Sequence, residues 1–226
     1  MGRYVKHSEL RYKLILDTAQ QLFIEEGIKN VSFSVLAEAC GIARATLYKY
    51  FPDKETLLWE IQRRSFQQFG ESLRKQDSEQ QLSALERYAL YFDVMLQGFQ
   101  VNPNNFLFFD LFSKTYQGET LKSESAIYER VFHDKDFGTH DTARFLQKNF
   151  HDGSLKPTLD AELTAVSAVY SSIYLLVGLS KDNMSIAIKY GMPPQDMARF
   201  IFDSFLIRIS SDGSIPCYSK SSDKTL

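Results

Sequence analysis

The chain has 226 residues, of which 44% are hydrophobic and 24% charged, and its net charge is −2. This composition is typical of a folded globular protein and excludes a chain that is basic throughout. No apolar run suggests a membrane span, and the N-terminus MGRYVKHSELRYK lacks the apolar stretch of a secretory signal. The two cysteines, Cys40 and Cys217, lie far apart, so we expect no disulfide framework and a cytoplasmic location.

Helical periodicity dominates the chain and strand signals are nearly absent, which predicts an all-α fold of about nine helices. In chain order we expect helices over about 8–26, 32–40, 43–50, 53–76, 80–100, 105–116, 121–135, 139–152, 159–180 and 194–210. The polar segment from Lys75 to Gln81 predicts a break after the long fourth helix. We divide the chain into a domain over 1–52, a helical domain over 53–210 and a disordered Ser/Lys/Asp-rich tail over 211–226.

Residues 32–58, SFSVLAEACGIARATLYKYFPDKETLL, place two short helices and a tight turn close together. Ser32 and Asp53 are suited to cap helix N-termini. Ala37 is small enough for two helices to cross there, Gly41 permits the positive φ of a tight turn, and Leu47 anchors the second helix. These positions predict a helix-turn-helix, the arrangement that places one helix in the major groove of DNA. By their spacing alone they also fit an ordinary pair of short helices.

The flanking residues separate these two readings. The sequence resembles the motif of the TetR family of transcriptional regulators, G-V-S-x-G-T-L-Y-x-Y-F-x-x-K-E-x-L, with further matches upstream. The matching residues are Ser32, Leu36, Ala37, Gly41, Thr46, Leu47, Tyr48, Tyr50, Phe51, Lys54, Glu55 and Leu57. The resemblance covers about residues 10–60. It implies a three-helix DNA-binding domain and a C-terminal ligand-binding and dimerisation domain. Because the sequence shows no nucleophile–base motif, phosphate loop or metal-ligand spacing, we expect no cofactor and no enzymatic activity. Ala43 departs from the motif, because the family usually has Ser there, and this removes an N-cap.

The resemblance implies that Thr46, Tyr48, Tyr50 and Lys54 hold DNA phosphates. Hydroxyls and an ammonium suit this role because they donate to phosphate oxygens without reading sequence. We expect sequence readout from exposed positions early in the second helix of the motif. The candidates there are Arg44, Ala45 and Lys49, with Ser34 at the groove edge.

Two of these assignments have competing roles. Arg44 could pair with guanine or contact a phosphate instead. Tyr48 could pack its ring against the domain and present only its hydroxyl.

Aromatic residues are concentrated in the middle of the chain, where the run FLFFDLF covers too much of a helix to face one way. Relatives in the family use this region as an inducer pocket, and dense aromatic packing is how apolar ligands are usually held. We therefore expect a small, largely apolar or aromatic ligand. The candidate contacts are Phe92, Phe99, Phe109, Phe112, Tyr116, Tyr128 and Phe132. Each of them could equally be an ordinary core residue.

The last two predicted helices carry apolar residues over more of their circumference than one intramolecular face needs. The family resemblance implies a four-helix interface between two subunits, against the alternative of two core helices in a monomer. The candidate interface residues are Leu163, Val166, Tyr170, Ile173, Phe200, Ile201 and Phe205.

We therefore expect a homodimeric repressor that a small-molecule inducer releases from a palindromic double-stranded DNA operator. Two other functions stay open. One is a ligand-independent DNA-binding or assembly protein of the same fold. The other is a metal-dependent hydrolase built on the pairs His133-Asp134, His140-Asp141 and His151-Asp152, whose spacings match no known metal-ligand pattern.

Overall fold

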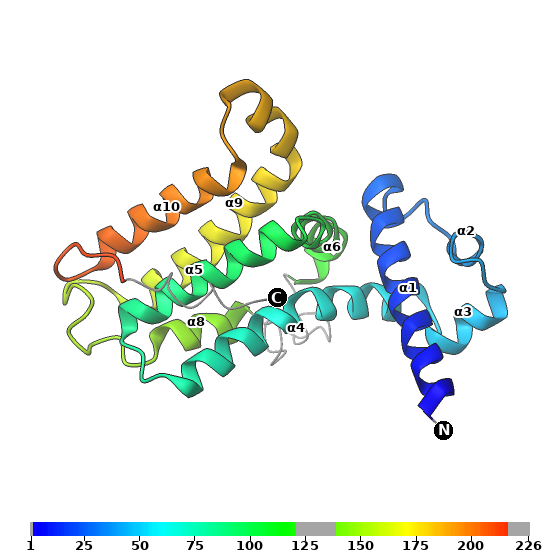
Figure 1. Ribbon diagram of the computed structural model, residues 1–226, viewed down its shortest axis with the longest axis horizontal. Helices are drawn as coiled ribbons and strands as arrows, with labels where there is room; N and C mark the ends of the chain where they lie inside the picture. The colour runs from blue at the N-terminus through cyan, green and yellow to red at the C-terminus, as the bar shows by residue number, and fades with distance from the viewer. Residues whose placement is uncertain (1, 121–138, 217–226) are drawn as a thin grey trace.

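The computed structural model describes residues 2–120 and 139–216, and these form nine α-helices. Within those ranges there is no β-strand, only one isolated bridge between Leu155 and Ser210. The predicted all-α fold, with an N-terminal helix-turn-helix and a C-terminal helical domain, is confirmed. The molecule is elongated, with the first three helices at one end and the later helices at the other (Figure 1).

The N-terminal end consists of α1 (Gly2–Glu26), α2 (Phe33–Ala39) and α3 (Arg44–Tyr50). α1 begins six residues before its predicted start, because nothing between Gly2 and Ser8 interrupts the helix. It ends before Gly27, which has a φ of +83°. Ser32 caps α2 by accepting a hydrogen bond from the Val35 amide, as predicted.

α4 (Lys54–Glu79) leaves this end and runs into the second domain beside α5 (Ala84–Val101). Asp53 caps α4 by accepting a hydrogen bond of 2.7 Å from the Thr56 amide. This bond lowers the pKa of the Asp53 carboxyl. The break that was predicted at 75–81 falls later, at 80–83, and a capping box of Ser83 and Glu86 then starts α5.

The remaining helices are α6 (Asn104–Thr120), α8 (Thr139–Gln147), α9 (Ala161–Tyr190) and α10 (Pro194–Ile209). The helix predicted over 121–135 lies outside the described residues, as does the tail from residue 217. α9 continues ten residues past its predicted end at 180. No proline or strained glycine interrupts it until Gly191, which adopts a φ of +61°.

The buried apolar residues form two clusters, one for each end of the molecule. The N-terminal cluster joins α1–α3 to the first half of α4, where Leu57 and Ile61 are fully buried. The second cluster joins the end of α4 to α5, α8, α9 and α10. α6 contributes to both, since Phe108 and Phe112 belong to the first and Phe106 to the second. α4 and α6 therefore both connect the two domains.

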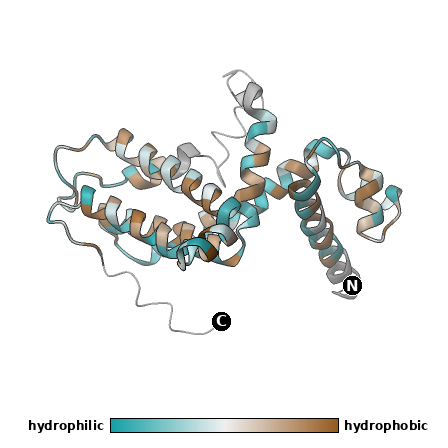
Figure 2. Ribbon diagram, turned by 90° about the horizontal axis from the view of Figure 1, so that it is seen from above, coloured by the Kyte–Doolittle hydropathy of each residue, from teal (hydrophilic) through white to brown (hydrophobic). Residues whose placement is uncertain are grey.

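The expectation that no apolar run reaches membrane-spanning length is wrong for α9. This helix is long and apolar enough to cross a membrane by length and composition, with a mean hydropathy of 1.6 over its best window. However, 56% of that window is buried inside the protein, where α9 packs against α5, α6, α8 and α10. Figure 2 shows apolar residues spread along all the helices rather than confined to α9. The apolar character of α9 is therefore that of a core helix with one uncovered face.

Candidate functional site

The turn of the helix-turn-helix is built as the sequence predicts. Gly41 adopts a φ of +62°, and the Ile42 amide donates to the Ala37 carbonyl across the turn. Ala37 and Leu47 are buried between α2 and α3, at 3% and 0% exposure. Ala43, at the N-cap of α3, makes no side-chain capping bond, as expected. Buried anchors on one side of α3 thus fix which residues face away from the domain.

The predicted readout residues lie on the outward face of α3. Arg44, Ala45 and Lys49 are all exposed, and Ser34 is exposed on the first turn of α2. The Arg44 guanidinium donates a hydrogen bond of 3.1 Å to the Tyr48 hydroxyl and lies 5.5 Å from the centre of its ring. Arg44 is therefore held along the outward face of α3.

Tyr48 packs its ring against the domain and keeps its hydroxyl at the surface. Its ring centre lies 5.1 Å from that of Phe33 on α2, which fixes the side chain by packing. Tyr48 is nevertheless 43% exposed, and its hydroxyl accepts the hydrogen bond from Arg44. Thr46 is half-buried, and Tyr50 places its hydroxyl 3.5 Å from that of Ser8 on α1. Tyr50 therefore presents its phenol where α3 meets α1.

Lys54 has a structural contact that the sequence did not reveal. It is half-buried, and its ammonium donates a hydrogen bond of 2.8 Å to the Ile28 carbonyl in the turn between α1 and α2. The same ammonium lies in the first turn of α4, where the helix dipole favours an anion. The partner is 26 residues away in sequence, so only the fold brings the two together.

The aromatic candidates for ligand contact lie in different places and do not surround one cavity. Phe92 stacks on Phe202 of α10, with ring centres 4.5 Å apart, and Phe99 packs against Phe106. Phe112 and Tyr116 pack on Trp59 in the N-terminal cluster. Phe109 faces the cavity described next. Tyr128 and Phe132 lie outside the described residues.

A cavity of about 50 Å³ lies between α4, α5, α6, α8 and α9. Its wall is largely apolar and includes Phe66, Phe109 and Ile173. Gln62 also lines it, and its buried Oε1 accepts no hydrogen bond from the described part of the protein. Tyr91 completes the wall, with its hydroxyl 2.6 Å from that of Ser172, and burial raises the pKa of this phenol. The cavity thus presents one unused acceptor in apolar surroundings.

The outer face of α9 and α10 is rich in exposed apolar side chains. Leu163 is 68% exposed, Tyr170 44% and Phe200 73%, with Val166 and Ile201 less exposed. Tyr174, which the sequence prediction omitted, is 52% exposed and stacks on Tyr170. Two predicted interface residues lie elsewhere. Ile173 is 6% exposed in the core, and Phe205 is half-buried against Tyr88 and Phe92.

Of the three His-Asp pairs, only His151-Asp152 has both side chains among those described. Asp152 accepts hydrogen bonds from the Ala84 amide at the start of α5 and from Ser154. Its carboxylate is therefore occupied in joining the loop after α8 to α5. No group of three potential metal-ligating side chains occurs among the described residues.

The fold and the outward face of α3 define an all-helical protein with a helix-turn-helix at one end. The family model for bacterial regulatory proteins of the tetR family matches residues 15–61. A fatty acid metabolism regulator protein of Bacillus subtilis is 30% identical over 86 residues, which are 38% of this chain and 44% of that protein. The HTH-type regulator YuxN of the same organism is 44% identical over 46 residues, which are 20% of this chain and 16% of that protein. The chain thus spans less than half the length of these relatives.

The likeness in fold extends over most of the chain. The ketosteroid transcriptional regulator KstR2 of Mycobacterium tuberculosis superposes with a TM-score of 0.62 and 18% identity, covering 88% of this chain and 95% of that one. Together with the matched motif, this confirms the predicted resemblance. Residues 15–61 thus match the tetR family of bacterial regulatory proteins, and the fold of the chain is like that of a regulator of this kind.

Proposed function

We propose that the protein is a cytoplasmic, homodimeric repressor that binds a palindromic DNA operator and releases it when a small, largely apolar or aromatic ligand binds. The observation that carries this proposal is the face of α3. Its inward residue Leu47 is fully buried, while Arg44, Ala45 and Lys49 remain exposed with no core role. A helix anchored in this way is suited to enter a major groove.

Thr46, Tyr48, Tyr50 and Lys54 are proposed to hold phosphates around that helix. They border the outward face of α3, and each carries a donor that suits a phosphate oxygen. Ser34 extends the same surface onto α2. These contacts fix the register of α3, and Arg44 supplies the sequence preference.

The ligand is proposed to bind at the cavity beside Gln62 and Phe109. At about 50 Å³ the cavity is smaller than the sites of drug-sized ligands, so a ligand has to displace part of its wall. The wall includes α4 and α6, the two helices that connect to the DNA-binding end. Because displacement of either helix alters the position of α3, ligand binding would shift the population away from the DNA-binding arrangement.

The small cavity also favours the second candidate, a DNA-binding protein of this fold that responds to no ligand. The two candidates differ in one measurement. Operator affinity that stays constant across a broad screen of apolar and aromatic compounds supports the second, whereas a compound that weakens it supports the first. A Phe109→Trp variant fills the cavity and should reduce the response to such a compound without changing affinity for the operator alone.

The DNA-binding part is tested with Arg44→Ala. We expect this variant to lose about 1–3 kcal/mol of affinity for a duplex selected from a random pool, and little for unselected DNA. Fluorescence anisotropy at a fixed salt concentration measures the affinity for the selected and for the unselected DNA. Lys29→Ala is the matched control, because Lys29 is an exposed cation outside the motif. Equal losses on both DNAs would show that Arg44 holds a phosphate rather than reading a base.

A further inference from the structure

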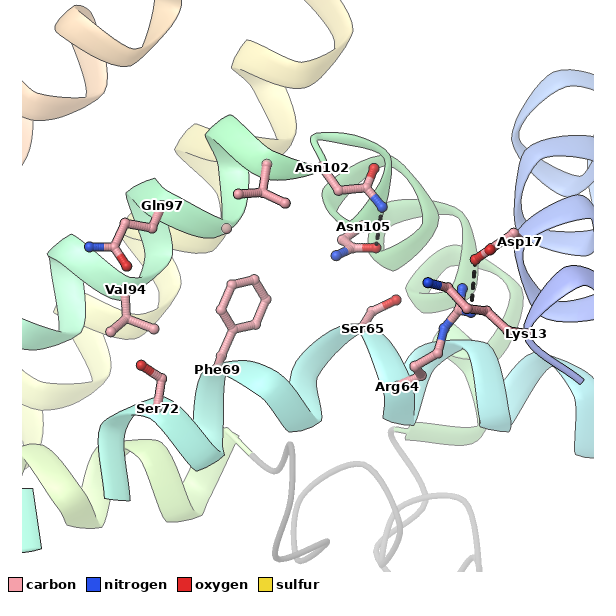
Figure 3. A pocket seen from close by; sticks show the side chains of 12 residues that line it. Lys13, Asp17, Arg64, Ser65, Phe69, Ser72, Val94, Gln97, Asn102 and Asn105 are labelled. Atoms are coloured by element: carbon pink, nitrogen blue, oxygen red, sulfur yellow. Dashed lines mark hydrogen bonds and ion pairs between the residues drawn. The ribbon is translucent and has the colours of Figure 1, made fainter. Parts of the chain in front are cut away.

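A second hollow lies at the junction of the two domains and is distinct from the cavity beside Gln62. It is an open groove of about 320 Å³ between α1, α4, α5 and the turn that follows α5 (Figure 3). α1 contributes Lys13 and Asp17, and α4 contributes Arg64. Phe69 of α4 lines both hollows and therefore separates them.

One end of the groove is cationic. Arg64 pairs with Asp17 at 2.8 Å and donates to the Gln20 amide oxygen at 3.4 Å. A guanidinium has five N–H donors, so these contacts leave some of them unused. Lys13 has no ion pair within the described parts of the chain and lies beside Arg64 (Figure 3). Two cations thus face one carboxylate, and the excess positive charge is open to the groove.

Asn105 adds a neutral donor whose direction is fixed. Its side-chain oxygen accepts hydrogen bonds from the Gln20 amide at 3.0 Å and from the Asn102 amide at 3.2 Å. Because the oxygen is held by two donors, the NH2 group must point the other way. Figure 3 shows this nitrogen directed toward the interior of the groove. The groove therefore carries ammonium and guanidinium donors at one end and an amide donor directed into its interior.

The opposite side of the groove is apolar. Its apolar residues are Phe69, Val94 and Val101, of which Val101 is 85% exposed, and the polar residues Ser72 and Gln97 lie beside Val94 (Figure 3). Gly98 allows the Phe69 ring to lie directly against α5, since a Cβ there would be only 1.9 Å from the ring. The groove thus combines donors for an anion with an apolar wall, and its volume is within the range of small-molecule sites.

We propose that this groove binds a small organic anion, with a carboxylate or phosphate head on Lys13, Arg64 and Asn105 and an apolar body against Phe69 and Val101. Such a ligand differs from the largely apolar or aromatic compound proposed for the Gln62 cavity because it carries an anionic head. Its head would contact α1 of the DNA-binding end, and its body would contact α5 of the second domain. The groove would therefore act as a second effector site that links the two domains.

The test uses octanoate and octyl phosphate as probes, because eight carbons bury enough apolar surface for binding to be measured. Octanol is the uncharged control. Two-dimensional amide NMR of the full chain without DNA follows the titration. We expect saturable shifts at Gly98 and at the Asn105 side-chain amide with at least one anion, and none with octanol. The probe that binds with the higher affinity shows whether the groove prefers a carboxylate or a phosphate head group.

Asn105→Asp is the decisive variant. It keeps the oxygen that Gln20 and Asn102 contact, but it replaces the donor with a negative charge that faces the groove. We expect it to weaken anion binding about tenfold or more. Asn104→Asp makes the same change one residue away, where the amide contacts Gln21 outside the groove, and should have a much smaller effect.

Lys13→Gln, compared with the exposed Lys75→Gln on α4, tests the cationic end in the same way. Equal binding of octanoate by the Asn105→Asp and wild-type proteins would overturn the proposal, as would equal binding of octanol or a Kd above about 1 mM for both anions. Because these measurements contain no DNA, their outcome is independent of the proposed repressor function.

Discussion

Lys54 illustrates how one side chain can serve both the fold and the proposed DNA contact. An ammonium has three donors, and the bond to the Ile28 carbonyl uses one of them. The remaining two are available to a phosphate. The bond to Ile28 ties the turn after α1 to the start of α4, so Lys54 also fixes the position from which it would meet DNA.

We predict that Lys54→Met lowers both stability and DNA affinity. The Ile28 carbonyl loses a charged donor, which should cost about 1–3 kcal/mol in urea-induced unfolding. Affinity should fall to a similar extent for all DNA sequences, and the salt dependence of binding should lose about one counterion. Lys75→Met is the control, since Lys75 is an exposed lysine on α4 outside the DNA-binding end. Unchanged stability in Lys54→Met would argue against the bond to Ile28.

At the scale of helices, the caps and turns that depend on neighbouring residues could be predicted from the sequence, whereas contacts between distant segments could not. The Ser32 and Asp53 caps and the Gly41 turn depend only on residues within a few positions, and the structure confirms them. α6 was recognisable as a helix, but its aromatics divide between two clusters. Phe108 and Phe106 face different domains because α6 lies between them, and no local pattern reveals that position.

The end of α4 shows the same limit. Its polar sequence predicts a break, yet the helix continues through Asp77. There the carboxylate pairs with the Arg87 guanidinium of α5 at 2.8 Å and with the Lys148 ammonium at 2.8 Å. Arg87 is almost fully buried, with 3% of its side chain exposed, and it also donates to the Lys148 carbonyl. These partners, 10 and 71 residues away, hold the last turn of α4 in place.

We predict that Asp77→Asn destabilises the protein by about 3–5 kcal/mol, because it removes the carboxylate that pairs directly with the buried Arg87 guanidinium. Burial acts to raise the pKa of the Asp77 carboxyl, but hydrogen bonds from Lys148 and Arg87 outweigh it and lower the pKa overall. Because the pKa is lower in the folded state, the ionised carboxyl stabilises the fold at pH values above its pKa in the unfolded chain, about 3.9. This contribution is lost as the pH falls through the pKa of the folded state.

The pH dependence supplies the second measurement for this variant. Urea unfolding between about pH 5 and pH 2 should show a shallower loss of stability for Asp77→Asn than for the wild type. Asp182→Asn, at an exposed position on α9, serves as the control. Identical acid slopes in wild type and Asp77→Asn would contradict a stabilising ion pair at the end of α4.

At the scale of the whole molecule, the two domains are joined by more than the long helix α4. α6 packs against α1, and the Gln20 amide on α1 donates to Asn105 near the start of α6. Arg64 of α4 pairs with Asp17 of α1 beside this bond. These contacts tie α1 to both α4 and α6 at the junction.

The uncovered apolar face of α9 and α10 is the other feature that belongs to the whole molecule. Leu163, Tyr170, Tyr174 and Phe200 are all exposed, whereas scattered single apolar residues are the norm on a monomer surface. A second copy of the chain, related by two-fold symmetry, would cover this face and set the spacing of the two α3 helices.

We predict that the wild-type protein sediments as a dimer at micromolar concentration and that Tyr170→Glu and Phe200→Glu each raise the dimer Kd at least about thirtyfold. Each variant places a charge where an aromatic ring would be buried. As dimerisation weakens in these variants, their affinity for a palindromic DNA site should fall, while their affinity for a half-site should not change. Val101→Glu is the matched control, because Val101 is an exposed apolar residue on α5. A monomeric wild type, or unchanged dimerisation in both variants, would show that this face does not pair the subunits.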